Sequence, residues 1–458
     1  MDRYLQFLIF FTILASILGF MQWYLLRAYL SWLQKVATDK GYVVLRAAGM
    51  YILFAGNLIF LLRFPSTEMG WYQSTLFQYL IIYPGGVFFG IIVTAFILLL
   101  LTHSVSGLYR IGSRVLHRSG PVPPASNQAP AASDPASASD PASASDPVSA
   151  SSNPASPSDP ALRTDSSDLP LINRRQFLKT TGAAAIAAPA LLTVGASAAT
   201  SHDYRIIRKS LYFPDLPLSL NGLKIVQISD IHSGIYMTEN QMRDIFALAN
   251  EQHPDLVTIT GDFVDNSISE IPALYRAIPD LKAEYGIYGC LGNHDHYASA
   301  SSVTSALRQR NVDVLTNDHK TLTINGESLT LIGVDDAVTG QTDAERFRRA
   351  TRNIPENGFR ILLSHRPDLF DEAVNHDVNL TLSGHTHGGQ IGFNILGLPL
   401  YPIYLFQKYP KGLFRQGDQQ LYVNVGIGMV GIPIRTVRPE LTVLELTNRK
   451  AAYPDNTI

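Results

Sequence analysis

The feature that most constrains the fold of this chain is a pattern that recurs between residues 202 and 458. Short runs rich in Val, Ile and Leu are bounded by Gly, Asp or Ser, as in LKIVQIS, DLVTIT, YGIYGCL, FRILLS and VNLTLS. Apolar runs of this length between such residues are typical of buried strands. Thr238-Glu239-Asn240-Gln241 has the spacing of a capping box and predicts a helix that reaches Gln252. The pattern predicts an α/β domain, a four-layer α/β/β/α sandwich with helices outside two central sheets.

A polar cluster follows each of these five runs. The clusters contain Asp230 and His232, then Asp262, then Asn293 with His294 and Asp295, then His365, and finally His385 and His387. Open α/β sheets place their sites at the carboxyl ends of strands, so we expect these side chains at one edge. Any one cluster could simply cap a turn, but five in this order are not expected by chance.

The residue types of the clusters indicate a metal centre. Carboxylate and amide oxygens mixed with imidazoles suit Mn, Fe or Zn better than Ca. Three oxygen donors and four imidazoles are more than one open ion needs, so the pattern predicts two divalent metal ions. Two ions about 3.5–4 Å apart can hold the attacking and leaving oxygens of a phosphoryl transfer.

These motifs, D-x-H, GD, GNHD, H and GHTH in this order, resemble the calcineurin-like metallophosphoesterase superfamily. The resemblance covers Leu223–Gly389 by motif and residues 202–458 by fold. Within the superfamily the chain is similar to a membrane-associated bacterial branch. That branch includes enzymes that cleave UDP-2,3-diacylglucosamine, a lipid A precursor, and cell-envelope phosphodiesterases.

The resemblance also implies roles for individual residues. The first metal would be bound by Asp230, His232 and His387, the second by Asn293, His365 and His385, and Asp262 would bridge the two. His294, oriented by Asp295, would protonate the leaving oxygen or stabilise the charged phosphorane. A metal-bridging hydroxide would attack phosphorus in line.

Three neighbouring residues have less certain roles. Asp265 lies three positions after Asp262, where purple acid phosphatases have Tyr, so a tyrosinate–iron site is not expected. Asp265 could hold a ligand loop, although a turn or cap role is equally compatible with its position. His296 and Arg366 adjoin predicted ligands and are candidate substrate-binding residues; a plain loop role is the alternative for both.

Residues 1–106 contain three apolar segments, each long enough for a helix that crosses a bilayer, which takes about 20 residues. They are Leu5–Leu26, Val43–Leu62 and Leu80–Leu101. Lys and Arg follow the first and third segments, which predicts an N-terminus outside and a cytoplasmic chain after Leu101. We therefore expect a multi-pass protein of the bacterial inner membrane, with the lipid bilayer as a partner.

The next two segments predict a spacer and an export signal. Residues 107–170 are rich in Pro, Ala, Ser and Asp and have little to bury, so we expect a disordered linker. In residues 171–200, Arg174-Arg175-Gln176-Phe177-Leu178-Lys179 resembles the twin-arginine export motif, and Ala196-Ser197-Ala198 could be a cleavage site. The alternative is a fourth transmembrane helix. Either interpretation places residue 202 onward outside the cytoplasm, and the first implies the twin-arginine translocase as a partner.

The remaining features bear on partners and substrate. The net charge of −2 gives no indication of nucleic-acid binding, and the single Cys290 excludes an intramolecular disulfide and a Cys-rich zinc site. Residues 393–415 are aromatic and apolar and end in basic residues, so they could admit a phosphorylated lipid; filling the core is the alternative. The predicted function is a membrane-tethered dinuclear phosphoesterase that cleaves a phosphodiester or pyrophosphate. The alternative is a non-catalytic envelope module in which the metals only stabilise a binding surface.

Overall fold

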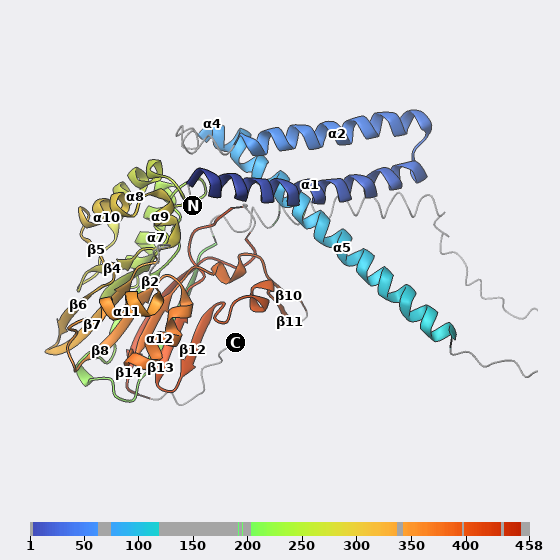
Figure 1. Cartoon of the computed structure of the whole chain (residues 1–458). Coiled ribbons are helices and arrows are strands. Elements are labelled where there is room, and N and C mark those ends of the chain that lie inside the picture. Colours follow the sequence, from blue (N-terminus) through green and yellow to red (C-terminus); the bar gives the residue numbers. More distant parts are fainter. Residues whose placement is uncertain are drawn as a thin grey trace, which may run out of the picture. The chain divides into compact units, whose positions relative to one another are not determined.

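The computed structural model describes residues 3–62, 75–118, 203–336, 342–395, 398–431 and 435–449, together with Leu191 and Gly195. The N-terminal part is helical (Figure 1). Its elements are α1 (Arg3–Val36), α2 (Asp39–Leu61), α4 (Thr75–Phe77), the π-helix η2 (Gln78–Ile82) and α5 (Tyr83–Arg118).

By length and composition, two helices among the described residues could cross a membrane, Asp39–Leu61 and Leu80–Ile111. They coincide with the second and third predicted spans. The first predicted span, Leu5–Leu26, lies within α1, and most side chains of its N-terminal half are outside the described residues. Its crossing of the membrane therefore stays a prediction.

The boundary predicted for the linker is wrong at its N-terminal end. Helix α5 continues to Arg118, so residues 107–118 are helical where the sequence suggested a disordered spacer. The Leu and Arg residues there have high helix propensity, so the helix extends the apolar segment before it. Residues 119–170 of the linker, and all but two positions of the signal-like segment 171–200, lie outside the described residues.

The C-terminal part contains two six-stranded sheets. The first has the order β1-β14-β2-β3-β4-β5, with bounds β1 Arg205–Tyr212, β2 Lys224–Ile228, β3 Leu256–Thr260, β4 Ile287–Cys290, β5 Val312–Val314 and β14 Glu440–Thr447. The second has the order β12-β13-β9-β8-β7-β6, with bounds β6 Asp318–Ile324, β7 Glu327–Val334, β8 Phe359–Ser364, β9 Leu380–Ser383, β12 Gly412–Gln416 and β13 Gln419–Val423. A separate hairpin joins β10 (Phe393–Ile395) to β11 (Leu398–Leu400).

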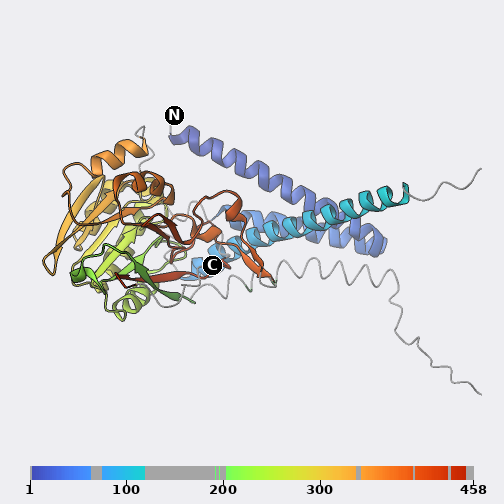
Figure 2. The same cartoon turned by 90° about the horizontal axis from the view of Figure 1, so that it is seen from below.

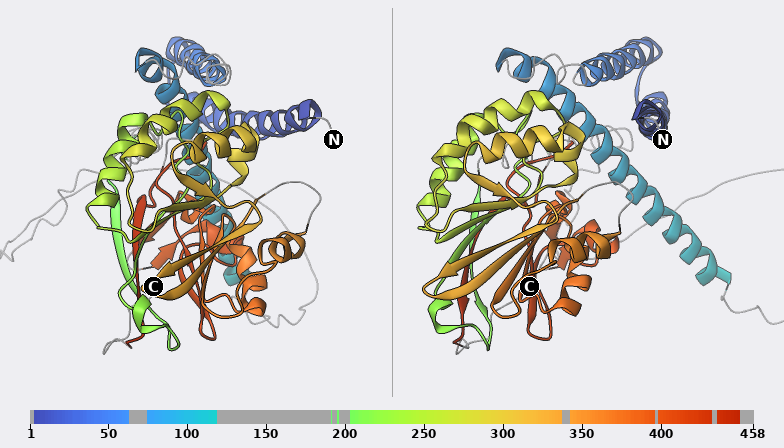
Figure 3. Two further views of the ribbon diagram at one scale, coloured as in Figure 1. Left: turned by 90° about the vertical axis from the view of Figure 1, so that its left-hand side faces the viewer. Right: turned by 60° about the vertical axis from the view of Figure 1, so that its left-hand side comes forward.

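The core lies between the two sheets and between each sheet and its helices. Ile225 and Leu256 of the first sheet share one buried cluster with Leu363 and Leu382 of the second, and Cys290 is fully buried in it. Figures 2 and 3 show the two sheets from further directions. The helices that pack outside them are α7 (Glu239–Asn250), α8 (Ile271–Ala277) and α10 (Ala300–Arg308) on the first sheet, and α11 (Asp343–Ala350) and α12 (Phe370–Ala373) on the second.

Local sequence explains why these elements begin where they do. The predicted capping box is confirmed at α7: the Gln241 backbone N–H donates to the Thr238 hydroxyl, and the Thr238 N–H donates to the Gln241 side chain at 2.8 Å. Strands β2, β3 and β4 are parallel neighbours, as are β8 and β9. Their carboxyl ends therefore lie at the same edge of each sheet, which positions the residues that follow them.

Candidate metal centre

The chain leaves the strands in an unusual conformation at the predicted ligands. Asp230, His232, Asp262, His385 and His387 all have a positive φ, between 46° and 70°. This left-handed conformation is uncommon outside glycine, and strained residues of this kind cost about 1–3 kcal/mol each and gather at functional sites. The backbone therefore turns sharply at these positions so that the side chains face a common centre.

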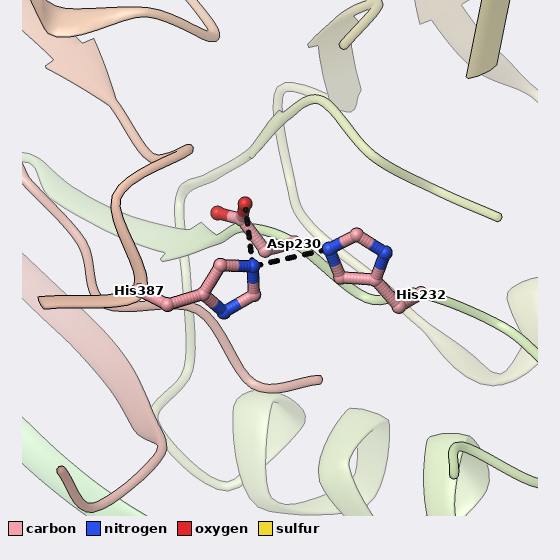
Figure 4. A group of neighbouring side chains, drawn as sticks. All are labelled: Asp230, His232 and His387. Atoms are coloured by element: carbon pink, nitrogen blue, oxygen red, sulfur yellow. Dashed lines mark hydrogen bonds and ion pairs between the residues drawn. The ribbon is translucent and has the colours of Figure 1, made fainter. Parts of the chain in front are cut away.

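Three of these residues form a first group (Figure 4). His387 Nε2 lies 3.4 Å from Asp230 Oδ1 and 3.1 Å from His232 Nε2. All three side chains are buried. The Ser229 hydroxyl donates to Asp230 Oδ2 at 2.6 Å and the His385 backbone N–H donates to the same carboxylate, so its orientation is held from two sides.

A second group contains Asp262, His365 and His385. His365 Nε2 lies 3.1 Å from both Asp262 Oδ2 and His385 Nδ1, and His365 Nδ1 faces the carbonyl of Thr260 at 2.8 Å. Asp262 Oδ2 is also 3.6 Å from His232 Nε2 of the first group. Asp262 thus lies between the two groups, where a bridging ligand is expected.

Asn293 supplies an observation that fits a metal ion. It begins α9 (Asn293–Ala298) and is 6% exposed, yet its Oδ1 accepts no hydrogen bond within the described part of the chain. A buried amide oxygen normally finds a donor. Gly292, the residue before Asn293, approaches Asp262 closely, so this oxygen belongs to a loop that borders the second group. An amide oxygen together with imidazoles and carboxylates is a donor set that suits divalent transition metals.

His294 lies at the border of this cluster. Its backbone N–H donates to Asp262 Oδ1 at 2.9 Å, and its ring stands edge-on to His232 with ring centres 4.7 Å apart. The ring Nδ1 faces the backbone carbonyl of Asp265 and lies 3.5 Å from Asp265 Oδ1. A carbonyl can only accept, so Nδ1 carries the proton and Nε2 is turned away from this contact.

The expectation that Asp295 orients His294 is wrong. The Asp295 carboxylate accepts hydrogen bonds from the backbone N–H groups of Gly292, Phe263 and Val264, at 2.8 to 3.2 Å. Consecutive residues on a helix do not face each other, so Asp295 turns back towards the start of α9. Its role is to join the two ligand-bearing loops, and Asp265 occupies the position next to the His294 ring.

Without a bound cation, the imidazoles of the cluster have pKa values that are shifted in opposite directions. Burial lowers the pKa of His232, but neighbouring aspartates outweigh it and raise the pKa to about 9. The pKa of His365 is likewise raised by aspartates, against burial, to about 10. Burial and the charge of His365 lower the pKa of His385 to about 3. Two imidazoles thus hold protons that a bound metal ion would have to displace.

We expect metal binding to release about two protons at pH 7, because ligating imidazoles must be neutral. Acidification favours the protonated, metal-free state of His232 and His365, so metal affinity falls as the pH decreases. As the pH increases, metal affinity rises until both imidazoles are neutral in the metal-free protein. Calorimetric titration of metal-free protein with Mn²⁺ or Zn²⁺, in buffers of different ionisation enthalpy, measures the released protons. The surface variant His376→Gln should release the same number, and a proton count of zero would contradict this linkage.

The two candidate substrate-binding residues each have an acidic partner from the loop after β7. His296 Nε2 lies 2.7 Å from Asp335 Oδ1, and the Arg366 guanidinium lies 2.8 Å from Asp336 Oδ1. The hydrogen bond to Asp335, against burial, raises the pKa of His296. Both side chains are therefore fixed in place, and the Arg366 side chain keeps 47% exposure, so its outer face is open to a ligand.

Glycine is required where loops approach the carboxylates. A Cβ at Gly384 would lie 2.2 Å from Asp230 Oδ2, and one at Gly292 would lie 2.2 Å from Asp262 Oδ1. Neither carboxylate can move without leaving its group. The glycines of the GNHD and GHTH motifs thus permit a backbone approach that any side chain would block.

Sequence reasoning missed Arg435, which is 1% exposed and carries a buried charge. Its guanidinium donates to the carbonyls of Val425 at 2.5 Å, Gly426 at 2.8 Å and Gly428. Gly428 in turn donates its N–H to the Asp230 carbonyl at 2.7 Å. Arg435 thereby braces the loop behind the first group. Only its place in an otherwise apolar stretch could have signalled this.

Known proteins share this domain. The calcineurin-like phosphoesterase family model matches residues 223–389. The uncharacterized metallophosphoesterase YkuE of Bacillus subtilis is 34% identical over 285 residues, which cover 60% of this chain and 98% of that protein. The phosphodiesterase YaeI of Escherichia coli is 28% identical over 290 residues, 60% of this chain and 100% of that protein.

A relative from zebrafish, a transmembrane protein with metallophosphoesterase domain, is 32% identical over 249 residues. These cover 50% of this chain and 54% of that protein. Three findings indicate the same family: the family model, the similarity to the Bacillus protein over 98% of its length, and the carboxylates and imidazoles that gather at one site. The chain belongs to the calcineurin-like phosphoesterases and is a metal-dependent hydrolase of phosphoric esters.

Proposed function

We propose that the chain hydrolyses a phosphodiester or a pyrophosphate at a dinuclear metal centre within a four-layer α/β/β/α sandwich. Asp230, His232 and His387 would hold one divalent ion and Asn293, His365 and His385 the other, with Asp262 between them. The observation that carries this proposal is the position of Asp262, whose Oδ2 lies 3.1 Å from His365 of one group and 3.6 Å from His232 of the other.

The residues of the chain then have separate tasks. When bound, the ions supply an activated water as nucleophile and neutralise charge on the phosphoryl group. His294 donates a proton to the leaving oxygen from Nε2, because its Nδ1 is engaged by the Asp265 carbonyl. The Asp265 carboxylate, 3.5 Å from the ring, stabilises the charged imidazolium. Arg366 and His296 would bind the non-bridging oxygens of the substrate.

The chemistry of the substrate follows from weaker observations. The Escherichia coli relative is called a phosphodiesterase and the zebrafish relative a transmembrane protein, which favours a phosphodiester and a location at the membrane. We propose a multi-pass protein of the bacterial inner membrane whose catalytic domain lies outside the cytoplasm, exported by the twin-arginine translocase. A lipid or other envelope phosphodiester fits that location, as does a UDP-diacylglucosamine-type pyrophosphate if its nucleotide reaches the site.

Metal removal tests this function. We expect purified full-length protein to bind two equivalents of Mn, Fe or Zn and to hydrolyse bis(4-nitrophenyl) phosphate. A chelator should abolish turnover. Titration with metal should restore turnover only as the second equivalent binds, because both groups of ligands must hold an ion. Metal content by mass spectrometry and turnover are measured on the same samples.

Two outcomes would contradict the proposal. Full activity at one equivalent of metal would show that a single ion suffices. Tight binding of two equivalents without turnover of mono- or diesters would instead favour a binding module that metals brace.

A further inference from the structure

An exposed apolar tip lies next to the metal centre. The short helix η9 (Pro402–Leu405) and the residue after it expose Leu405 by 81%, Phe406 by 80% and Tyr404 by 50%. Three large apolar side chains in succession at the surface are unusual for a water-facing loop, because each forgoes the gain of burial. We call this group the apolar tip; exposed apolar side chains grouped in this way are typical of interaction surfaces.

The apolar tip is joined directly to the turn that carries two predicted ligands. A Cβ at Gly389 would lie 2.8 Å from Ile403 Cβ, so η9 packs against the end of the GHTHGG motif. The Thr386 hydroxyl, between His385 and His387, donates to the carbonyl of Pro410 at 2.6 Å. Whatever binds the tip is therefore held beside the reaction centre.

The charges around the tip indicate the nature of the partner. Residues 398–416 contain Lys408, Lys411 and Arg415 and no Asp or Glu. Lys411 Nζ lies 3.5 Å above the ring of Tyr401, and Lys408 pairs with Asp371 at 2.7 Å while its side chain remains 62% exposed. Apolar side chains flanked by cations are the pattern of a segment that enters the headgroup layer of an anionic bilayer.

We propose that the apolar tip docks on the surface of an anionic phospholipid bilayer and brings the metal centre to phosphodiesters in the headgroup layer. The chain itself contains two helices that could cross a membrane by length and composition, so a bilayer is at hand. The cations Lys408 and Lys411 beside the apolar side chains favour an anionic bilayer over a purely apolar protein surface. The docking inference does not depend on the proposed function, whereas the delivery of a lipid phosphodiester to the metal centre rests on it.

A single fluorophore can report docking in the full-length protein. Cys290, the only cysteine, is fully buried, so Leu405→Cys can be labelled selectively with an environment-sensitive dye. The matched control is Leu218→Cys in η3 (Leu218–Leu220), which is 83% exposed. Because β1 runs antiparallel to β2 through β14, the segment after β1 lies at the sheet edge opposite the metal centre.

In reconstituted vesicles of phosphatidylcholine and phosphatidylglycerol, we expect the dye at position 405 to shift to the blue and to resist an aqueous quencher. The dye at position 218 should do neither, and high salt should weaken the shift because cations contribute. Equal quenching at the two positions in every vesicle would overturn the proposal. A shift that follows protein concentration and ignores lipid composition would assign the tip to a second copy of the chain and would also overturn it.

Activity gives a second readout. The double variant Leu405→Ser/Phe406→Ser should hydrolyse a vesicle-embedded fluorescent phosphodiester lipid about tenfold more slowly than wild type, a factor that equals one step of about 1.4 kcal/mol. Its turnover of soluble bis(4-nitrophenyl) phosphate should be unchanged, since the metal centre is intact. Equal loss on both substrates would indicate damage to the site and overturn docking as the cause. If wild type hydrolyses neither substrate, the proposed function fails, and the dye experiment still decides docking.

Discussion

His294→Gln should lower kcat on an alkyl phosphodiester by about 10²- to 10⁴-fold while the protein keeps its bound metal, which is the loss expected for a positioned proton donor. The His294 ring lies near His232 and Asp262, and its backbone N–H, which glutamine keeps, donates to Asp262 Oδ1, so the substitution should leave the other ligands in place. Glutamine has a similar length but cannot transfer a proton. Metal content and steady-state rates are measured on one preparation.

The size of the effect depends on the leaving group. A 4-nitrophenolate needs little protonation, whereas an alkoxide does, so the loss should be larger on an alkyl diester. The control His376→Gln changes a surface histidine that pairs with Glu372 and lies against the Phe347 ring, and it should keep wild-type rates. A loss that is independent of the leaving group, or a loss of metal, would show that His294 does not act as the acid.

The substitution Asp262→Asn should remove metal binding together with activity. Asp262 is 2% exposed, and its Oδ2 lies near His365 and His232 of the two groups. At this position both ligand groups need a negatively charged oxygen, and an amide carries no charge and presents N–H donors. We therefore expect neither ion to be retained. Several kcal/mol of charge stabilisation are lost, and at one factor of ten for about 1.36 kcal/mol the rate should fall by about 10³-fold or more.

The fold should survive this change. Asn has the shape of Asp and can still accept the backbone hydrogen bond from His294. The control Asp418→Asn alters an exposed turn residue and should keep two metal ions and full activity. Thermal unfolding with and without Mn²⁺ separates the effects: wild type gains stability from the metal, and Asp262→Asn should gain none. Retention of two equivalents of metal would refute a bridging role.

The comparison of Asp265 with Asp295 shows where sequence reasoning ends. Both residues lie near the predicted ligands, and the sequence indicated Asp295 as the partner of His294 because the two are adjacent. The structure places Asp295 against three backbone N–H groups and Asp265 beside the ring. Which carboxylate meets a ring depends on how the loops after β3 and β4 pack, and spacing along the chain does not encode that.

The contacts of His296, Arg366 and Arg435 also depend on tertiary packing. Asp335 and Asp336 follow β7 of the second sheet. Asp335 pairs with His296 of α9, which follows β4 of the first sheet, and Asp336 pairs with Arg366, which follows β8. Arg435 braces the loop beneath Asp230 through backbone carbonyls, which have no sequence signature. Likewise, the polarity of η9 alone did not tell whether its aromatic side chains fill the core or face solvent.

The sequence by itself determined the five strands that precede the predicted ligands, the cap of α7 and the residues that gather at the candidate metal centre. The physical reason is that apolar periodicity dictates which segments are buried, and parallel strands bring the residues after their carboxyl ends to one edge. Only the tertiary structure decided that Asp262 lies between two ligand groups, which of two carboxylates lies beside the His294 ring, and that Leu405 and Phe406 are exposed. Those features depend on distances between loops that are remote in the chain, and such distances are set by packing.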